Sequence, residues 1–229
     1  NSDDVGAIDT LSFALETGYE FLDTAEIYGL GHSEELIGEA LRQFPGSRPF
    51  IATKVSPENL NPGKLIQSAE ASLNRLGVDV IDLYQIHRWD PLVPPEETLE
   101  ALNDLVRHGK VCYIACSNLT GWQLAQYLYL ADTHLLDRFV SIQPVYNALN
   151  RGIELEILPL CADQGLGVIP YNPLAGGVLT GKYKRGAELP SGSRLSVNEG
   201  YRQRYLANEM FDLVERFLKV ADEMNVSPA

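Results

Sequence analysis

The sequence predicts an α/β fold in which helices cover a parallel sheet. Short apolar runs rich in β-branched and aromatic residues recur along the chain, and amphipathic patterns with apolar residues at three- and four-residue spacing separate them. The runs are apolar throughout, which is typical of strands buried on both faces. No linker or composition break interrupts this alternation, so we expect a single domain over 1–229. A doubly wound open sheet and a (β/α)8 barrel both fit the pattern.

Six runs are expected to form the strands. In chain order they are FLDTA (21–25), FIATK (50–54), VIDLYQIH (80–87), VCYIACSN (111–118), FVSIQPVY (139–146) and GVIPYN (167–172). Gly18 is placed to end a helix before the first strand, and Ser33 is placed to cap the helix after it, with acids in its first turn. The polar, turn-rich stretch 184–205 is expected to be a loop over a site, and a final helix is expected over 206–224.

Composition narrows the function classes. The 229 residues are 45% hydrophobic and 21% charged, which is ordinary for a globular protein. The net charge of −13 argues against a nucleic-acid partner, because phosphate backbones bind to basic surfaces. Cys112 and Cys116 lack the spacing of metal ligands and are interpreted as reduced core thiols, so no metal site is expected. With no membrane-length apolar run and no leader-like N-terminus, we expect a cytoplasmic protein.

Each expected strand ends on a polar or functional group. These ends are Asp23, Lys54, His87, Ser117 with Asn118, Gln143, and Tyr171 with Asn172. Because the carboxyl ends of parallel strands lie on one side of the sheet, these side chains are expected to converge, together with Tyr28 from the loop after the first strand.

Four of these groups suit the chemistry of carbonyl reduction. A phenol has a pKa near 10, and a neighbouring ammonium such as that of Lys54 would lower the pKa by about 1–3 units. Asp23 would hold the lysine charged, and a neutral His87 would orient a carbonyl oxygen. Tyr28 could then act as a general acid, although a hydride would have to come from a cofactor. Each residue alone has an ordinary structural explanation, and only the joint placement at strand ends favours catalysis.

Six motifs cover nearly the whole chain: DTAEIYGLGHSEELIGEAL, IATK, LYQIHRWDP, GKVCYIACSN, SIQPVYN and YNPLAGGVLTGKY. In their residues, order and spacing they resemble the aldo-keto reductase family. The sequence is most similar to the branch that includes bacterial reductases and potassium-channel β subunits.

The resemblance implies a (β/α)8 barrel that binds NADPH (NADP+) across its C-terminal rim and reduces a small carbonyl substrate. Tyr28 would donate the proton, Lys54 and Asp23 would adjust the acidity of its phenol, and His87 would orient the carbonyl. Trp89 would line the substrate mouth. The cofactor-binding residues implied are Ser117, Asn118, Gln143, Tyr171, Pro173, Leu174, Gly176, Leu179, Lys182 and Arg194.

Two departures from the family pattern matter. The sequence begins after the family's first strand and stops before its last strand and helix, so we expect part of a longer protein with two barrel strands missing. The segment that normally reads the adenosine 2′-phosphate is among the missing parts. The preference for NADP over NAD, the particular aldehyde or ketone, and possible homo-oligomer formation are therefore left open.

Two rival functions also fit parts of the sequence. Residues 176–182 fit G-x-x-x-x-G-K, the phosphate-binding loop of nucleoside triphosphatases. In that loop a Ser or Thr that binds Mg²⁺ should follow the lysine, but here Tyr183 follows it. The stronger rival is an NADPH-binding regulatory subunit of a larger complex with little turnover. The intact set of Asp23, Tyr28, Lys54 and His87 argues against it, because a binding module does not need the acid.

Overall fold

The computed structural model describes residues 3–44, 46 and 48–229. It divides into two compact units: unit 1 contains Asn1–Ile142 and Leu160–Val168, and unit 2 contains Gln143–Pro159 and Ile169–Ala229. That both belong to the one domain expected from the sequence stays a prediction.

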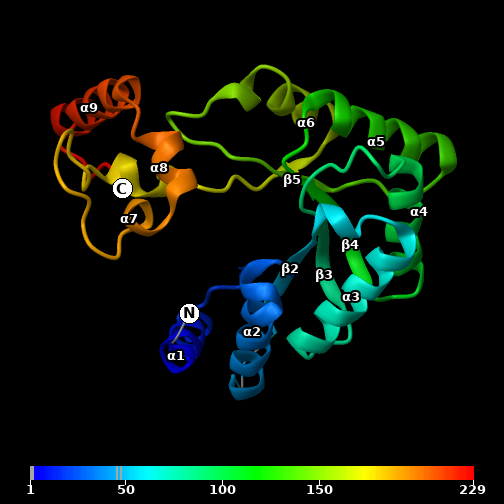
Figure 1. Ribbon diagram of the computed structural model, residues 1–229. Coiled ribbons are helices and arrows are strands. Elements are labelled where there is room, and N and C mark those ends of the chain that lie inside the picture. Colours follow the sequence, from blue (N-terminus) through cyan, green and yellow to red (C-terminus); the bar gives the residue numbers. More distant parts are fainter. Residues whose placement is uncertain (1–2, 45, 47) are drawn as a thin grey trace. The chain divides into compact units, whose positions relative to one another are not determined.

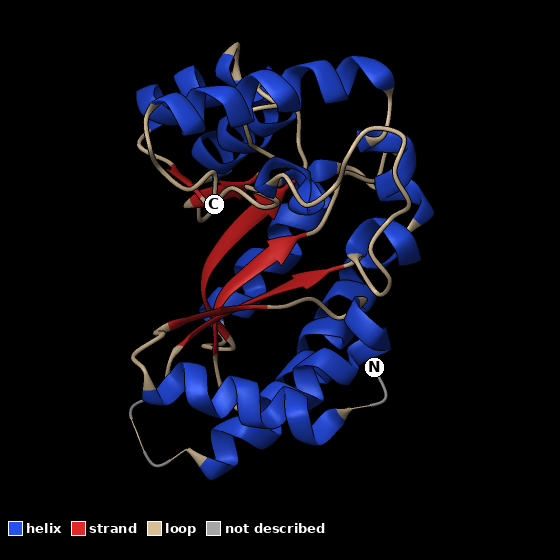
Figure 2. Cartoon of the chain, turned by 90° about the vertical axis from the view of Figure 1, so that its left-hand side faces the viewer, coloured by secondary structure: helices blue, strands red, loops and turns tan. Residues whose placement is uncertain are grey.

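A six-stranded parallel sheet runs through unit 1 (Figures 1 and 2). Its strands are β1 (Phe21–Asp23), β2 (Phe50–Val55), β3 (Ile81–Ile86), β4 (Val111–Ser117), β5 (Ser141–Gln143) and β6 (Gly167–Val168), and they neighbour one another in sequence order. A doubly wound sheet reverses its strand order at a switch point, whereas a barrel keeps it. The unreversed order is therefore that of an α/β barrel, and the predicted α/β class is confirmed.

Helices alternate with the strands, and the helices that follow β1 to β4 lie along the outer face of the curved sheet (Figure 1). They are α1 (Asp4–Glu16), α2 (His32–Gln43), α3 (Pro62–Leu76), α4 (Pro95–Arg107), α5 (Gly121–His134) and α6 (Ile157–Gln164). α3 shows how local sequence sets the bounds. Asn61 caps it by accepting a hydrogen bond from the Gly63 amide, Pro62 occupies its first turn, and Gly77 ends it with a left-handed φ of 67°.

One predicted cap was wrong. α2 begins at His32, one residue before the expected Ser33 cap, and its N-cap is Gly31 at φ 96° without a side-chain cap bond. The Ser33 hydroxyl instead accepts a hydrogen bond from the Thr24 hydroxyl at 3.0 Å, so it ties the helix to the end of β1.

The close packing of α2 on α3 depends on Gly38. A Cβ at this position would lie 2.5 Å from the Arg75 carbonyl oxygen and 2.9 Å from that of Leu76, both of which are backbone atoms. The two helices therefore approach each other more closely than any residue with a side chain would allow.

Unit 2 has its own apolar core, formed by the buried residues Ala175, Val178, Leu179, Tyr183, Leu195, Tyr205 and Val214. They belong to η4 (Ala175–Thr180), α7 (Arg194–Val197), α8 (Glu199–Tyr205), α9 (Asn208–Glu223) and the segment between η4 and α7. The final helix was predicted within two residues at each end.

Two sequence expectations differ from the structure in this region. The stretch 184–205 is not wholly loop, because Leu195 and Tyr205 are buried and anchor the short helices α7 and α8. The run GVIPYN forms a strand only over Gly167–Val168, since Pro170 has no amide to donate to a ladder, and only a bridge between Val145 and Tyr171 follows.

The two cysteines of β4 differ in their exposure to solvent. Cys116 is buried as expected, but Cys112 is exposed at the start of β4, where Tyr113 beside it is exposed too. The interpretation of Cys112 as a core thiol was therefore wrong.

Among the helices that the structure describes, none combines the length and the apolar character required to cross a membrane.

Candidate active site

An ion pair lies at the carboxyl ends of β1 and β2. The Nζ of Lys54 donates to Oδ2 of Asp23 at 2.7 Å and to the backbone carbonyl oxygen of Thr24 at 2.7 Å. The Lys54 side chain is completely buried, whereas that of Asp23 is 30% exposed. Burial lowers the pKa of the Lys54 ammonium, and the charge and hydrogen bond of Asp23 oppose that effect. The carboxylate therefore compensates for the cost of burying this cation.

Tyr28 begins η1 (Tyr28–Gly31), the loop that joins β1 to α2. Its ring centroid lies 5.4 Å from the Lys54 Nζ and 5.8 Å from the His87 ring, which it meets edge-on. The phenol is 42% exposed. The predicted four residues Asp23, Tyr28, Lys54 and His87 are thus brought together within unit 1.

The Tyr28 loop is held at both ends. On one side, Oε1 of Glu26 accepts hydrogen bonds from the Ser56 amide at 2.6 Å and from the Asn59 side chain at 3.0 Å. On the other side the backbone passes through three successive left-handed residues, including Leu30 at φ 56°. A leucine in that region is strained, and strain of this kind persists where the surroundings fix the backbone.

His87 follows β3 and is partly buried. Burial lowers the pKa of its imidazole, and the nearby cations Lys54 and Arg88 lower the pKa further. The ring is therefore neutral at neutral pH, as a group that orients a carbonyl by hydrogen bonding should be.

Ser117 and Asn118 lie beside His87 at the end of β4. The Asn118 amide nitrogen donates to the His87 carbonyl oxygen at 3.1 Å and to the Ser117 hydroxyl at 2.9 Å. Asn118 adopts a left-handed φ of 56°, which asparagine tolerates better than most residues. The pair therefore fixes the ends of two neighbouring strands relative to each other.

Trp89 packs into a series of aromatic rings on unit 1. Its ring lies 5.6 Å from that of Trp122 and 5.7 Å from that of Tyr127, and Tyr127 in turn lies 4.9 Å from Phe139. Phe139 and Tyr127 are buried, while Trp122 is exposed. Trp89 is therefore supported from the core, close in sequence to His87.

Sequence reasoning missed a buried carboxylate beneath this site. Glu34 accepts hydrogen bonds from the Thr53 hydroxyl at 2.6 Å and from the Arg75 guanidinium at 2.7 Å, and none of its surface is exposed. Thr53 directly precedes Lys54, so this pair fixes the strand that carries the lysine. The signal was a glutamate on the apolar face of an amphipathic helix, where a charge needs a partner.

The remaining predicted cofactor residues belong to unit 2, apart from Ser117 and Asn118. Gln143 is buried at the end of β5, and Leu179 is buried in the unit 2 core. Tyr171 is partly buried, whereas Pro173 and Leu174 are exposed. Each of these assignments stays a prediction.

Around η4 of unit 2, glycines and cations are packed together. A Cβ on Gly176 would lie 2.5 Å from the Tyr201 ring, and the Arg194 guanidinium lies 4.8 Å from the centroid of that ring. The end of the Lys182 side chain lies against Gly177. The phosphate-binding loop of a nucleoside triphosphatase leads directly into a helix, whereas no helix begins at Lys182 in this chain. That rival is therefore disfavoured.

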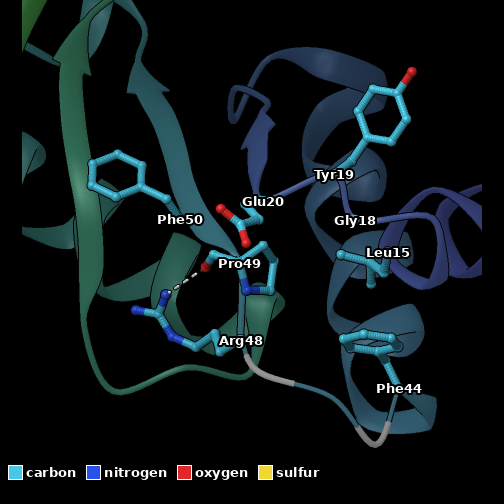
Figure 3. A pocket seen from close by; sticks show the side chains of 8 residues that line it. All are labelled: Leu15, Gly18, Tyr19, Glu20, Phe44, Arg48, Pro49 and Phe50. Carbon is cyan, nitrogen blue, oxygen red and sulfur yellow. Dashed lines mark hydrogen bonds between the residues drawn. The ribbon is translucent and has the colours of Figure 1, made fainter.

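A pocket of about 340 Å³ lies at the opposite, N-terminal ends of β1 and β2 (Figure 3). It is lined by Leu15, Gly18, Tyr19, Glu20, Phe44, Arg48, Pro49 and Phe50. Arg48 is already engaged there, because it donates to the carbonyl oxygens of Pro49 and Val80 and pairs with Asp82. None of the predicted site residues lines this pocket, so it is not the candidate active site.

Comparison with known proteins decides the family. The model of the aldo/keto reductase family matches residues 1–229. This chain belongs to the aldo-keto reductase family. The chain is 36% identical to the aldo-keto reductase dtxS3 of Metarhizium robertsii over 77% of this chain and 56% of that protein. It is 35% identical to a probable voltage-gated potassium channel subunit beta of Arabidopsis thaliana over 96% of this chain and 70% of that protein.

A solved structure agrees with this assignment. An aldo/keto reductase from Klebsiella pneumoniae in complex with NADP and acetate is 31% identical, with a TM-score of 0.71 over 77% of this chain and 61% of that one. The family and the branch expected from the sequence are thus confirmed, together with an α/β barrel fold. The chain spans little more than half the length of the Metarhizium relative.

Proposed function

We propose that this protein is an oxidoreductase that reduces aldehydes or ketones to alcohols with NADPH, with Tyr28 as the proton donor. The observation that carries the proposal is the grouping of Tyr28, His87 and the buried Lys54–Asp23 pair within one unit. A fully buried lysine is costly to keep, and its place beside an exposed phenol gives it a chemical purpose.

Each of the four residues has a defined task in this proposal. His87, neutral and held at the end of β3, donates a hydrogen bond to the substrate carbonyl oxygen. Tyr28 donates its proton to the same oxygen as negative charge develops there, an effect worth roughly 10²–10⁴ in rate. The Lys54 ammonium stabilises the phenolate that remains, and Asp23 holds the ammonium charged and aimed.

The residues of unit 2 fit the phosphates of a dinucleotide. Lys182 and Arg194 supply two cations beside the glycine turn at Gly176 and Gly177. The Ser193 hydroxyl next to Arg194 is buried without a hydrogen-bond partner among the described residues, as expected of a group that awaits an acceptor. When bound, the nicotinamide would supply the hydride. Ser117, Asn118, Gln143 and Tyr171 are proposed to hold the nicotinamide, and Pro173, Leu174 and Leu179 to line the path of the cofactor.

The substrate is proposed to be a small or aromatic carbonyl compound, with Trp89 at the mouth of the site. Its place in the aromatic series gives it a fixed orientation against which a planar group could pack. A cytoplasmic location and assembly with further copies stay predictions.

Substitution of Tyr28 by Phe tests the proposal, because it removes only the hydroxyl. Reduction of an aldehyde panel, followed as NADPH consumption, should fall roughly 10²–10⁴-fold. NADPH affinity, measured by quenching of tryptophan fluorescence, should stay within about twofold of the wild-type value, since the hydroxyl is not assigned to nucleotide binding. Turnover by Tyr28→Phe at the wild-type rate would refute the mechanism.

An NADPH-binding auxiliary subunit is the second candidate. The similarity to a plant protein described as a probable potassium channel subunit beta favours it. On that proposal the nucleotide would bind, the wild-type protein would turn over carbonyls barely faster than Tyr28→Phe, and a larger protein would co-purify with it. The two rates therefore separate the candidates.

A further inference from the structure

Gln85 is a buried polar residue that the four-residue site does not use. It lies on β3, two positions before His87, and pairs in register with Lys54 on β2. None of its surface is exposed. Its amide nitrogen Nε2 lies 3.3 Å from Oδ1 of Asp23. The carboxylate thus has Lys54 on one oxygen and Gln85 on the other.

The orientation of the Gln85 amide follows from its partner. An ionised carboxylate can only accept hydrogen bonds, so the amide must turn its NH₂ group toward Asp23. Its oxygen Oε1 consequently faces away, and among the described residues it has no hydrogen-bond partner. A buried acceptor without a donor destabilises the fold, because it has given up its hydrogen bonds to water and gained none in return.

Packing alone does not explain this residue. Leu83 lies two positions earlier on the same strand, is buried as well, and has no polar atom to satisfy. A methionine at position 85 would fill a similar volume without the unpaired oxygen. Because Gln85 is present in spite of this cost, we infer that its NH₂ group, which donates to Asp23, has a function.

We propose that Gln85 is a positioning residue that holds Asp23 Oδ1, so that Oδ2 stays on Lys54 and part of the carboxylate charge is neutralised. The inference rests on the proposed function. The effect is electrostatic: the stronger the negative charge that Lys54 and Tyr28 experience, the harder it is to remove a proton from either. Other charged groups that act on this site are Glu26, Glu34 and Arg88 together with His87, and none of them is changed by substitution at position 85.

The test compares Gln85→Met, Gln85→Glu and the matched control Leu83→Met. The first readout needs no cofactor or substrate: titration of the Tyr28 phenol by NMR with ¹³Cζ-labelled tyrosine, assigned with Tyr28→Phe. Loss of one hydrogen bond of about 0.5–1.5 kcal/mol should raise the Tyr28 titration midpoint in Gln85→Met by about half a unit to one unit. Gln85→Glu should raise it further, because it adds a charge, and Leu83→Met should leave it unchanged.

The second readout is the pH profile of kcat. The alkaline limb should move upward in the same order, and kcat of Gln85→Met at neutral pH should fall several-fold while NADPH affinity stays within about twofold. Equal midpoints in all three variants and wild type, or a shift in Leu83→Met as large as in Gln85→Met, would overturn the inference. If wild type reduces no carbonyl compound, the proposed function fails, and the phenol titration still tests Gln85 by itself.

Discussion

The Nζ of Lys54 lies 2.7 Å from Oδ2 of Asp23, although the lysine is entirely buried and the aspartate is not. The pair is therefore asymmetric. The carboxylate can be reached by solvent, whereas the ammonium depends on the carboxylate and on one backbone carbonyl oxygen for its hydrogen bonds. The Lys54 ammonium therefore lies beside the Tyr28 ring, and water does not screen its charge because the lysine is buried.

Replacing Lys54 by methionine should separate catalysis from folding. The variant removes the charge and keeps most of the volume, so we expect turnover to fall roughly 10²-fold or more. The free energy of unfolding should fall by only about 1–3 kcal/mol, because the remaining Asp23 is partly hydrated. Urea unfolding and steady-state kinetics measure the two effects, and unchanged turnover would remove Lys54 from the mechanism.

The lowered pKa of His87 predicts a dependence of stability on pH. A histidine has a pKa near 6.5 in the unfolded chain, so as pH falls below that value the unfolded state takes up the proton first and is favoured. The stability lost in wild type between pH 6.5 and the lower folded pKa should be smaller in His87→Gln. Thermal unfolding at pH 7.5 and pH 5 measures it, and identical losses in the two proteins would contradict the assigned neutral ring.

The phosphate assignment in unit 2 predicts a difference between two neighbouring lysines. Lys182 lies against Gly177, whereas the exposed Lys184 is not part of the proposed site. Lys182→Ala should weaken NADPH binding roughly tenfold, which is the effect of losing one charge-assisted hydrogen bond. Lys184→Ala should bind as wild type does. Equal affinities of the two variants in fluorescence titration would contradict the site.

Glu34 and Glu39 lie on the same helix and should differ in their contribution to stability. Glu34→Ala would leave the partly buried Arg75 without its partner and should cost about 3 kcal/mol. Glu39→Ala breaks an exposed pair with Arg42 and should lower the free energy of unfolding much less, because solvent screens that pair. Urea denaturation of both variants tests this, and a similar small cost for each would mean that the Glu34–Arg75 pair does not hold β2 in place.

Two glycine-to-alanine substitutions should have effects of opposite sign. Gly38→Ala places a Cβ against the backbone of α3 and should destabilise the protein by about 1–3 kcal/mol, despite the better helix propensity of alanine. Gly63→Ala, in the first turn of α3, meets only the Asn61 side chain at 3.8 Å and should stabilise by up to about 1 kcal/mol. Melting temperatures report both, and a stabilised Gly38→Ala variant would contradict the close approach of α2 and α3.

Much of unit 1 could be predicted from sequence because its signals are local. The apolar runs set the strands, and parallel strands necessarily bring Asp23, Lys54 and His87 to one side. The partners of buried charges could not be predicted in the same way. Arg75 reaches Glu34 across 41 positions, and no local pattern specifies that contact.

Gln85 and the helices α7 and α8 show two other limits. From sequence alone, the side chain of a glutamine in an apolar strand could lie on either face of the sheet. Only the pairing of Gln85 with Lys54 in the sheet register shows which face it occupies. In 184–205 the polar composition indicated a loop, but two well-separated residues, Leu195 and Tyr205, suffice to bury one side of two short helices. Such sparse anchors have no periodicity to detect.

The most direct test of the central claim is the fate of deuterium from NADPH labelled with two deuterons at the nicotinamide C4. Mass spectrometry of the alcohol formed from an unlabelled aldehyde measures it. The account predicts an alcohol one mass unit heavier in wild type, and at least about 10²-fold less of it from Tyr28→Phe in the same time. Alcohol without deuterium, or no alcohol although NADPH binds, would contradict a reductase and leave the binding subunit as the better account.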